Sequence, residues 1–319
     1  MSSFGDLNRI NTNILALQSQ LSLNKTNRSL GQSMLKMSTG LNINRAEDDA
    51  AGLSIANKTR GRIAGLQQAL SNVGDSKSVL DIAESSFDTI MDQLVEMKAL
   101  ATQAANDTLG QTERQFIASQ ITALGEDINE VSAQTVFQDT SLLKGNGGGN
   151  TGQISLTFQV GERAQDTITA NIDAVNIGLL FNGAGDGNAA GTTQLGATAG
   201  AITVTAESAL SSTDGGSLTF ATNASGADFR IFISAVDDAI ERMADRVNTV
   251  GISQRSLSIR EITLSSSISA NSSAVSRIMD LDFAKEMSNM IRLQILQQTS
   301  ISALGQANIG PQSVLGFLR

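Results

Sequence analysis

The sequence has 319 residues, and its 31 Asp and Glu outnumber its 22 Lys and Arg, which gives a net charge of -9. It contains no His, Cys, Trp or Tyr. These absences exclude Ser-His-Asp and Cys-His catalytic pairs, disulfides, and zinc sites with nitrogen or sulfur ligands. The acidic balance argues against nucleic acid or an anionic membrane as partner. Only catalysis by carboxylates, by a Ser-Lys pair or by Thr would remain. We expect no catalytic residue, no metal, no cofactor and no enzymatic activity.

Neither a membrane span nor a conventional secretory signal is expected. No segment approaches 18 consecutive apolar residues, the length that a transmembrane helix requires. The N-terminal segment 1–6 has no basic run followed by an apolar stretch, as a signal peptide would have. If the protein leaves the cell, it uses another route.

The N-terminal segment carries apolar residues at helical spacing in two phases. The second phase includes Leu23, Leu30, Met34, Met37 and Leu41. The first phase, which we expect to form an assembly surface, consists of Leu7, Ile10, Ile14, Leu17 and Leu21.

Alternating steps of three and four then predict a long helix over about 63–101. A turn at 106–110 precedes Thr112 and Glu113, which suit the start of a shorter helix that extends to about Val131. Lys77, Glu84 and Lys98 interrupt the apolar series of the first helix. Its principal seam residues are Leu66, Leu70, Val73, Phe87 and Leu94.

Alternation of apolar and polar residues predicts a β-hairpin over 153–173, with a polar loop at 161–166. The following region is rich in Gly, Ala, Ser, Thr and Asn, and no Lys or Arg occurs between Arg163 and Arg230. It contains two weaker strand candidates, at 202–205 and 218–220. We expect short strands and loops there.

The strongest periodicity runs from Phe229 to Ile278 and predicts a coiled-coil helix about 75 Å long. Gln254, Glu261 and Asn271 are its polar exceptions. The principal seam residues are Ile233, Val236, Ile240, Met243, Val247, Leu257 and Leu264. The fold class is therefore mainly α: an elongated hairpin-like helical coiled-coil bundle with a β-hairpin and a small outer insertion of strands and loops.

The C-terminal segment is apolar on more than one helical face. A single chain offers too little cover for such a helix, so additional copies of the chain are the economical partner. The expected assembly residues here are Met287, Met290, Ile291, Ile295, Leu296, Ile301 and Leu304.

Both ends of the chain resemble bacterial flagellin. The N-terminal signature comprises segments 10–13 (INTN), 38–41 (STGL) and 44–53 (NRAEDDAAGL), and 100–108 (LATQAANDT) is similar to the turn between the two rod helices. The C-terminal signature comprises 295–298 (ILQQ), 306–308 (QAN) and 317–319 (FLR). The resemblance covers about the first 140 and the last 90 residues, in the family's order.

The resemblance implies three domains. Residues 1–45 and 276–319 would pair as the inner-tube coiled-coil domain. Residues 46–175 and 226–275 would form the rod-like helical core with the hairpin at 153–173. Residues 176–225 would be a small variable outer insertion.

The resemblance also implies a function and a set of partners. The chain would polymerise with itself into the extracellular flagellar filament for swimming motility, after type III export without a cleavable signal peptide. Flagellar cap and hook-associated proteins, a flagellin export chaperone and the type III export gate would be its partners. The principal alternative is a hook-filament junction protein, which has related ends. A flagellin with a metalloprotease insertion would need HExxH, which a chain without His lacks.

One departure from the family concerns Toll-like receptor 5. The resemblance implies a receptor surface with an arginine at position 96, a leucine at position 100 and a glutamate at position 120. This chain has Glu96, Leu100 and Gln120. Reversal of one charge and loss of another should each weaken the free energy of receptor binding by about 1 kcal/mol or more at a buried interface. Weak or absent activation is therefore expected.

Two short motifs have alternative readings. Asp48 and Asp49 could be an acid and base pair, but adjacent side chains diverge, so capping and contacts between subunits are favoured. The triplet 223–225 (NAS) fits a glycosylation site, and O-linked sugars on the Ser- and Thr-rich centre are as plausible.

Overall fold

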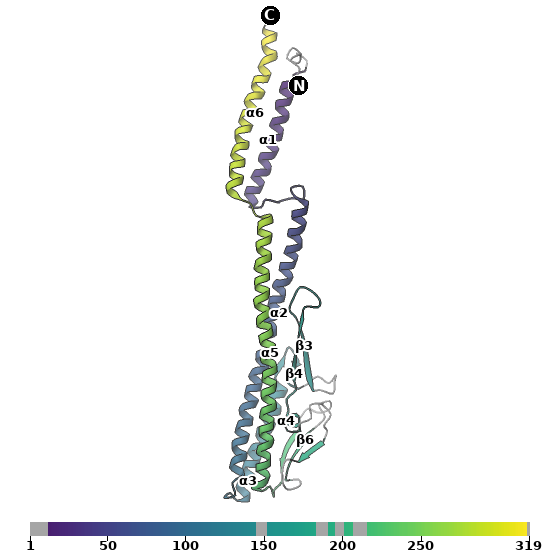
Figure 1. The fold of residues 1–319 in the computed structure, drawn as a ribbon, viewed down its shortest axis with the longest axis vertical. Coiled ribbons are helices and arrows are strands. Elements are labelled where there is room, and N and C mark those ends of the chain that lie inside the picture. The colour runs from purple at the N-terminus through teal and green to yellow at the C-terminus, as the bar shows by residue number, and fades with distance from the viewer. Residues whose placement is uncertain (1–11, 145–151, 183–190, 195–200, 207–215, 318–319) are drawn as a thin grey trace. The chain divides into compact units, whose positions relative to one another are not determined.

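The computed structural model describes residues 12–144, 152–182, 191–194, 201–206 and 216–317 (Figure 1). These residues divide between two compact units, Met1–Ala64 with Ile268–Arg319 and Gly65–Ser267. We call them the terminal unit and the central unit. The mainly helical class with small strand pairs is confirmed. The three-domain division stays a prediction.

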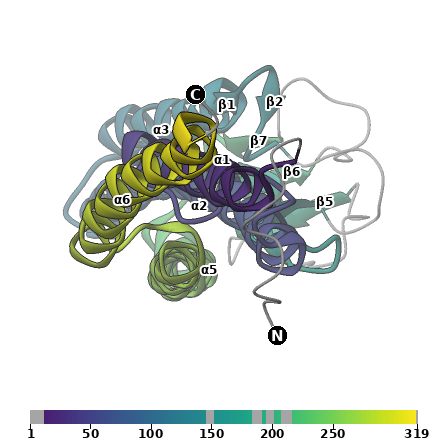
Figure 2. The ribbon, with the colours of Figure 1, turned by 90° about the horizontal axis from the view of Figure 1, so that it is seen from above.

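The terminal unit is built around two helices, α1 (Ile14–Thr39) and α6 (Phe283–Phe317), which lie side by side (Figure 2). Hydrogen bonds link the start of α1 to the later part of α6 and the end of α1 to the start of α6, so the pair is antiparallel. Helix α6 continues six residues past Pro311, the sole proline of the sequence. The first part of α2 (Ala50–Ala104) and the last part of α5 (Gly226–Met279) complete this unit.

Short connections join these helices. Gly40 ends α1 in the left-handed conformation, with φ of 71°, which glycine adopts without a steric penalty. The amide of Leu281 donates to the carbonyl of Gly40 at 2.9 Å, and the amide of Asn42 donates to the carbonyl of Met279 at 2.7 Å. The connection after α1 is therefore tied to the connection before α6.

In the central unit, α2 and α5 bury apolar residues at every seventh position. The fully or almost fully buried residues are Val73, Leu80, Phe87, Leu94 and Ala101 on α2, and Phe229, Val236, Met243, Val250 and Leu257 on α5. A repeat of seven residues keeps one stripe facing a neighbouring helix, as in a coiled coil. All twelve residues of the expected rod seam are buried or half-buried.

The polar interruptions of the two seams meet each other. The Lys77 ammonium lies 3.1 Å from the Glu261 carboxylate, and the Gln254 amide donates to Glu84 at 2.6 Å. These pairs show that α2 and α5 are antiparallel. They also satisfy polar groups that would otherwise weaken the seam.

Helix α3 (Gln111–Gln134) begins one residue before the expected Thr112, and Gly110 precedes it without a side-chain cap. It carries the smaller elements of the unit. Asn129 accepts a hydrogen bond from the amide of Ile177 at 3.0 Å and donates to the carbonyl of Gly216 at 2.8 Å. One side chain thus holds the start of α4 (Ile177–Asn182) and the approach to β7 (Ser217–Phe220).

The strands form three antiparallel groups. The short pair β1 (Val136–Phe137) and β2 (Thr140–Ser141) follows α3. The expected hairpin is confirmed as β3 (Gln153–Gln159) and β4 (Thr167–Asp173), with Ile154 opposite Ile172. The expected strands in the centre are confirmed as β6 (Ile202–Ala206) and β7, and β5 (Gly191–Gln194) extends their sheet.

Candidate assembly surface

The antiparallel α1 and α6 pair covers one stripe of each helix, whose residues are buried or half-buried. On α1 the stripe consists of residues such as Leu23, Leu30 and Met37, and on α6 it includes Leu293 and Ala307. Small or polar residues alternate with these apolar ones, so the interface between the helices is narrow. A narrow interface leaves the rest of each helix accessible to other molecules.

Polar bonds fix the register of this pair. The Asn13 side chain caps the start of α1 by accepting from the Ala16 amide at 3.0 Å, and it donates to the Ala307 carbonyl at 2.8 Å. Near the other end, the buried Ser33 hydroxyl donates to Glu286 at 2.6 Å. The two helices are therefore aligned by specific contacts rather than by apolar packing alone.

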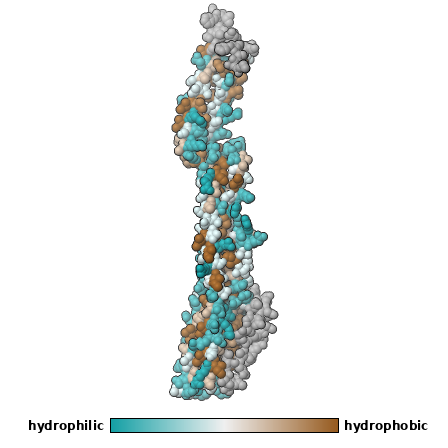
Figure 3. All heavy atoms as spheres, in the orientation of Figure 1, coloured by the Kyte–Doolittle hydropathy of each residue, from teal (hydrophilic) through white to brown (hydrophobic). Residues whose placement is uncertain are grey.

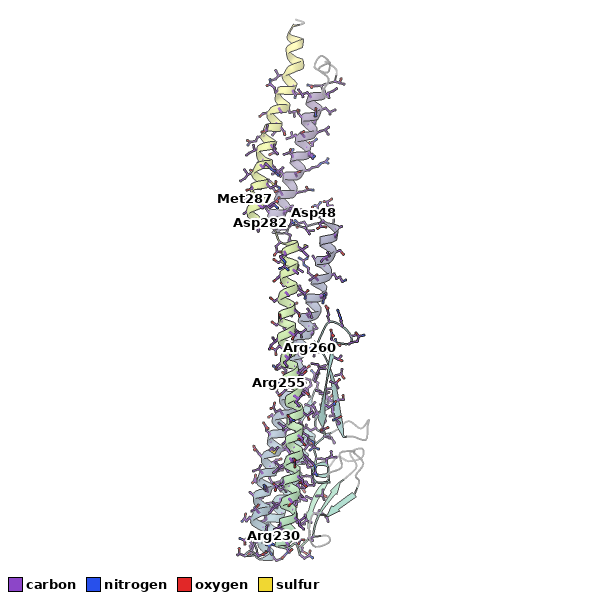
Figure 4. The ribbon with its side chains drawn as sticks, in the orientation of Figure 1. Asp48, Arg230, Arg255, Arg260, Asp282 and Met287 are labelled. Carbon is purple, nitrogen blue, oxygen red and sulfur yellow. The ribbon has the colours of Figure 1, made fainter. Side chains whose placement is uncertain are left out.

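Most of the expected assembly residues lie outside that buried stripe. Leu21 is 64% exposed on α1 and Ile295 is 59% exposed on α6. The exposed members of the expected set are Ile14, Leu17 and Leu21 on α1, and Met287, Ile291, Ile295, Leu296 and Ile301 on α6. We call them the outer α1 face and the outer α6 face. Figure 4 labels Met287 near the start of α6.

The remaining expected residues lie elsewhere. Met290 and Leu304 are half-buried on the side of α6 that packs against α1. Leu7 and Ile10 lie outside the described residues. Phe283, Leu15 and Ile309 are also exposed and extend the apolar surface beyond the expected set. The sequence pattern, with apolar residues on several sides of each helix, was consistent with additional exposed apolar residues of this kind.

The two outer faces are apolar, like surfaces that are normally buried in an interface. No charged residue occurs between Arg292 and Arg319, so most of α6 has no charged side chain that would favour its exposure to water. Figure 3 shows hydrophobic side chains on the visible surface of the helices. Contiguous exposed apolar surface marks a site of association in soluble proteins. None of the described helices is long and apolar enough to cross a membrane.

The connection between α1 and α2 explains the adjacent aspartates. The Asp48 carboxylate accepts from the amides of Asn44 at 3.1 Å and Arg45 at 3.0 Å, and Asp49 accepts from the Gly52 amide at 2.9 Å. Asp49 therefore caps the start of α2, as expected, whereas Asp48 closes the turn before it. Asp48 lies in this connection (Figure 4), where it shapes the backbone.

The two hydrogen bonds to Asp48 give a prediction about pH. The hydrogen bond from the Arg45 amide, with that from Asn44, holds the pKa of Asp48 below its ordinary value. A depressed pKa means that the stabilisation is complete above the unfolded pKa of about 3.9 and is lost as pH falls through the lower folded pKa. In an NMR pH titration, we expect the Asn44 and Arg45 amide shifts to change only below about pH 3.9. The Asp48→Asn variant should lack this transition, and a midpoint above pH 3.9 in the parent protein would contradict the prediction.

The expected receptor positions lie on the central unit. Glu96 is exposed on α2, Leu100 is half-buried on the same helix, and Gln120 is exposed on α3. Glu96 and Gln120 therefore present their side chains to solvent.

Sequence reasoning missed an ionic cluster where α2, α3 and α5 meet. Asp107 lies 2.8 Å from Arg230 and 3.7 Å from Arg114, and Arg114 also donates to the carbonyls of Ala104 and Asn106. Arg230 lies near the start of α5 (Figure 4). Its one sequence signal was an acidic residue within the predicted turn, which does not specify its partners.

The family comparisons agree with these helices. Residues 10–147 match the family model of the bacterial flagellin N-terminal helical region, and residues 233–318 match that of the C-terminal helical region. The chain is 35% identical over 317 residues to a flagellin of Bacillus subtilis, with 98% of this chain and 100% of the relative covered. The chain belongs to the bacterial flagellin family.

Other flagellin relatives extend the comparison. A flagellar filament 33 kDa core protein of Treponema phagedenis is 30% identical, with 97% of this chain and 99% of the relative covered. A crystal structure of Bacillus cereus flagellin aligns with a TM-score of 0.42 at 20% identity, covering 61% of this chain and 88% of that one. As a flagellin, this protein is a structural subunit of the bacterial flagellar filament. The alternative of a junction protein has less support. Flagellin homologues form their filament outside the cell.

Proposed function

We propose that this flagellin polymerises with itself through the outer α1 and outer α6 faces, and that it acts without enzymatic activity. The observation that carries the proposal is the exposure of eight of the expected apolar assembly residues on one helix pair. Burial of apolar surface contributes roughly 25 cal/mol per Å². Repeated copies of the chain would supply that burial, and the seam residues of α2 and α5 would keep the central unit stiff between contacts.

The export route, the location and the other partners belong to the same proposal. The subunit would be exported by the type III pathway without a cleavable signal peptide and would become extracellular. It would meet a chaperone and the export gate before assembly, and cap and hook-associated proteins at the filament. Support comes from membership of the flagellin family. Inner-tube, rod and outer domains, with the boundaries given above, complete the proposed organisation.

Seeded polymerisation tests this function. Purified monomer should elongate short filament fragments into long filaments, seen by negative-stain electron microscopy and by sedimentation. A junction protein would not form long filaments. A folded monomer that stays in the supernatant with active seeds would overturn the proposal.

The receptor positions give a separate prediction. Purified monomer should activate Toll-like receptor 5 weakly in a reporter assay, because Glu96 and Gln120 depart from the stimulatory pattern. The Glu96→Arg and Gln120→Glu double variant should lower the half-maximal concentration by about tenfold or more, since two charged contacts are restored. Glu126→Arg, a charge reversal at another exposed position of α3, is the control and should change little. Full activation by the unmodified monomer would refute this.

A further inference from the structure

The central unit is strongly acidic and has few cations. Between residues 65 and 267 the sequence has 24 Asp and Glu and only 10 Lys and Arg. Lys77 and Lys98 pair with acids across the seam. Arg255 on α5 is exposed, and among the residues that the structure describes no ion pair or hydrogen bond engages its guanidinium. Figure 4 labels Arg255 along α5. An unpaired cation in so acidic a surface is suited to an acidic partner.

Arg255 lies within an exposed apolar stripe on α5. The stripe consists of Ile252, Arg255, Ile259 and Ile262, and Ile262 is 71% exposed. We call it the α5 outer stripe. Its steps of three, four and three match the period of the buried seam, so the stripe stays on the side of α5 that faces away from α2. Three exposed isoleucines around one arginine form a patch that a partner could bury.

Helix α2 carries a surface of the opposite kind. Asp88, Asp92 and Glu96 follow one another at steps of four, and all three are exposed. Like charges at this spacing repel one another and weaken a helix. No ion pair relieves them within the described part of the chain. Val95, 54% exposed, lies beside them. We call these four residues the α2 acidic stripe.

We propose that the α5 outer stripe of one subunit docks on the α2 acidic stripe of a second copy of this chain. Arg255 would neutralise the carboxylates, and the isoleucines would pack on Val95. Two other acidic stretches, Asp238, Glu241 and Asp245 on α5 and Glu126, Asp127 and Glu130 on α3, have no exposed large apolar residue among their members, so they match the patch less well.

The geometry requires two copies. The Lys98 pair with Asp237 and the Lys77 pair with Glu261 place Ile259 close to the level of Lys77. Val95 is 18 residues further along α2 than Lys77, which corresponds to about 27 Å. Ile259 and Val95 of one chain therefore cannot meet. Because each copy presents both, the contact joins unlike surfaces and can repeat from copy to copy. This inference rests on the proposed self-assembly and specifies one of its contacts.

The absence of Cys from the sequence allows a clean proximity test. A chain with Val95→Cys and Ile259→Cys should polymerise and, after mild oxidation, give a ladder of disulfide-linked multimers on a non-reducing gel. A disulfide needs Cα atoms within about 7 Å, so a bond within one chain is excluded. The control combines Val95→Cys with Ile231→Cys and should give no ladder. Ile231 is exposed on α5, as Ile259 is, but lies outside the α5 outer stripe.

Charge-reversal variants provide a second test of this contact. Arg255→Glu and Glu96→Arg should each raise the critical concentration for seeded polymerisation about tenfold, and the combined variant should recover most of this loss. Lys144→Glu, an exposed charge reversal away from both stripes, should have little effect. If the parent protein polymerises, but the double-cysteine chain gives no ladder and the combined charge variant shows no recovery, this contact is overturned and the proposed function stands. Failure of the parent protein to polymerise would overturn both.

Discussion

The Ile295→Asp variant should lose seeded polymerisation while its monomer stays folded. Ile295 is 59% exposed on the outer α6 face, so the monomer loses little packing when it is replaced. In a polymer that covers this face, the new carboxylate would be moved from water into apolar surroundings, at a cost of several kcal/mol. We expect the critical concentration to rise at least 100-fold, or about 3 kcal/mol. Sedimentation over a concentration series measures it, and circular dichroism checks the fold.

Gln298→Asp is the matched control. Gln298 is exposed on the same helix, three residues further on, and the substitution adds the same charge at an already polar position. Its effect on the critical concentration should stay below about fivefold. Polymerisation of Ile295→Asp at the concentration of the parent protein would remove the outer α6 face from the proposed interface. Equal losses in both variants would point to net charge rather than to apolar burial.

The positions of Ile295 and Leu304 show how much of the assembly surface the sequence could predict. Apolar residues on several faces of the terminal helices indicated that neighbours must cover them. The pattern did not separate Leu304, which packs toward α1, from Ile295, which does not. That assignment depends on the register of α1 against α6. The Asn13 and Ser33 hydrogen bonds fix this register, and the periodicity of one helix contains no information about them.

The long elements were predictable because their periods extend over many residues. A seven-residue repeat from Val73 to Ala101 identifies a helix and its buried side at once. The shorter α4 and β5 were not predicted. Segments of four to six residues have little intrinsic preference and form because neighbouring elements hold them. The Asn129 bonds to the Ile177 amide and the Gly216 carbonyl are such a contact.

Contacts with short elements were also missed within α5, a helix that was otherwise well predicted, and Phe232 is the example. The expected seam of α5 includes Phe229 and Ile233 and passes over Phe232, although Phe232 is fully buried. Its ring stacks on Phe181 of α4 at 5.6 Å and meets Phe220 of β7 edge-on at 5.5 Å. A heptad pattern locates the face toward another long helix. It does not reveal a second buried face that packs against short elements.

The Phe232→Ala variant should be the most destabilising single change in the central unit. The substitution removes a fully buried aromatic side chain and leaves a cavity, which costs about 3–5 kcal/mol. It also removes two aromatic pairs, each worth about 0.5–1.5 kcal/mol beyond the buried area. Urea unfolding followed by circular dichroism should show this loss. Hydrogen exchange should show that β7 and α4 lose protection before the seam between α2 and α5, because the ring joins those elements to α5.

Phe116 provides the matched control for Phe232. It lies on α3 of the same unit and is 68% exposed, so Phe116→Ala removes the same chemical group without creating a cavity. We expect a change within about 0.5 kcal/mol. A Phe220→Ala and Phe232→Ala double variant should lose less than the sum of the single losses, because the two rings contact each other. Additive losses, or a Phe232→Ala cost no larger than that of Phe116→Ala, would show that the ring cluster does not join α4 and β7 to α5.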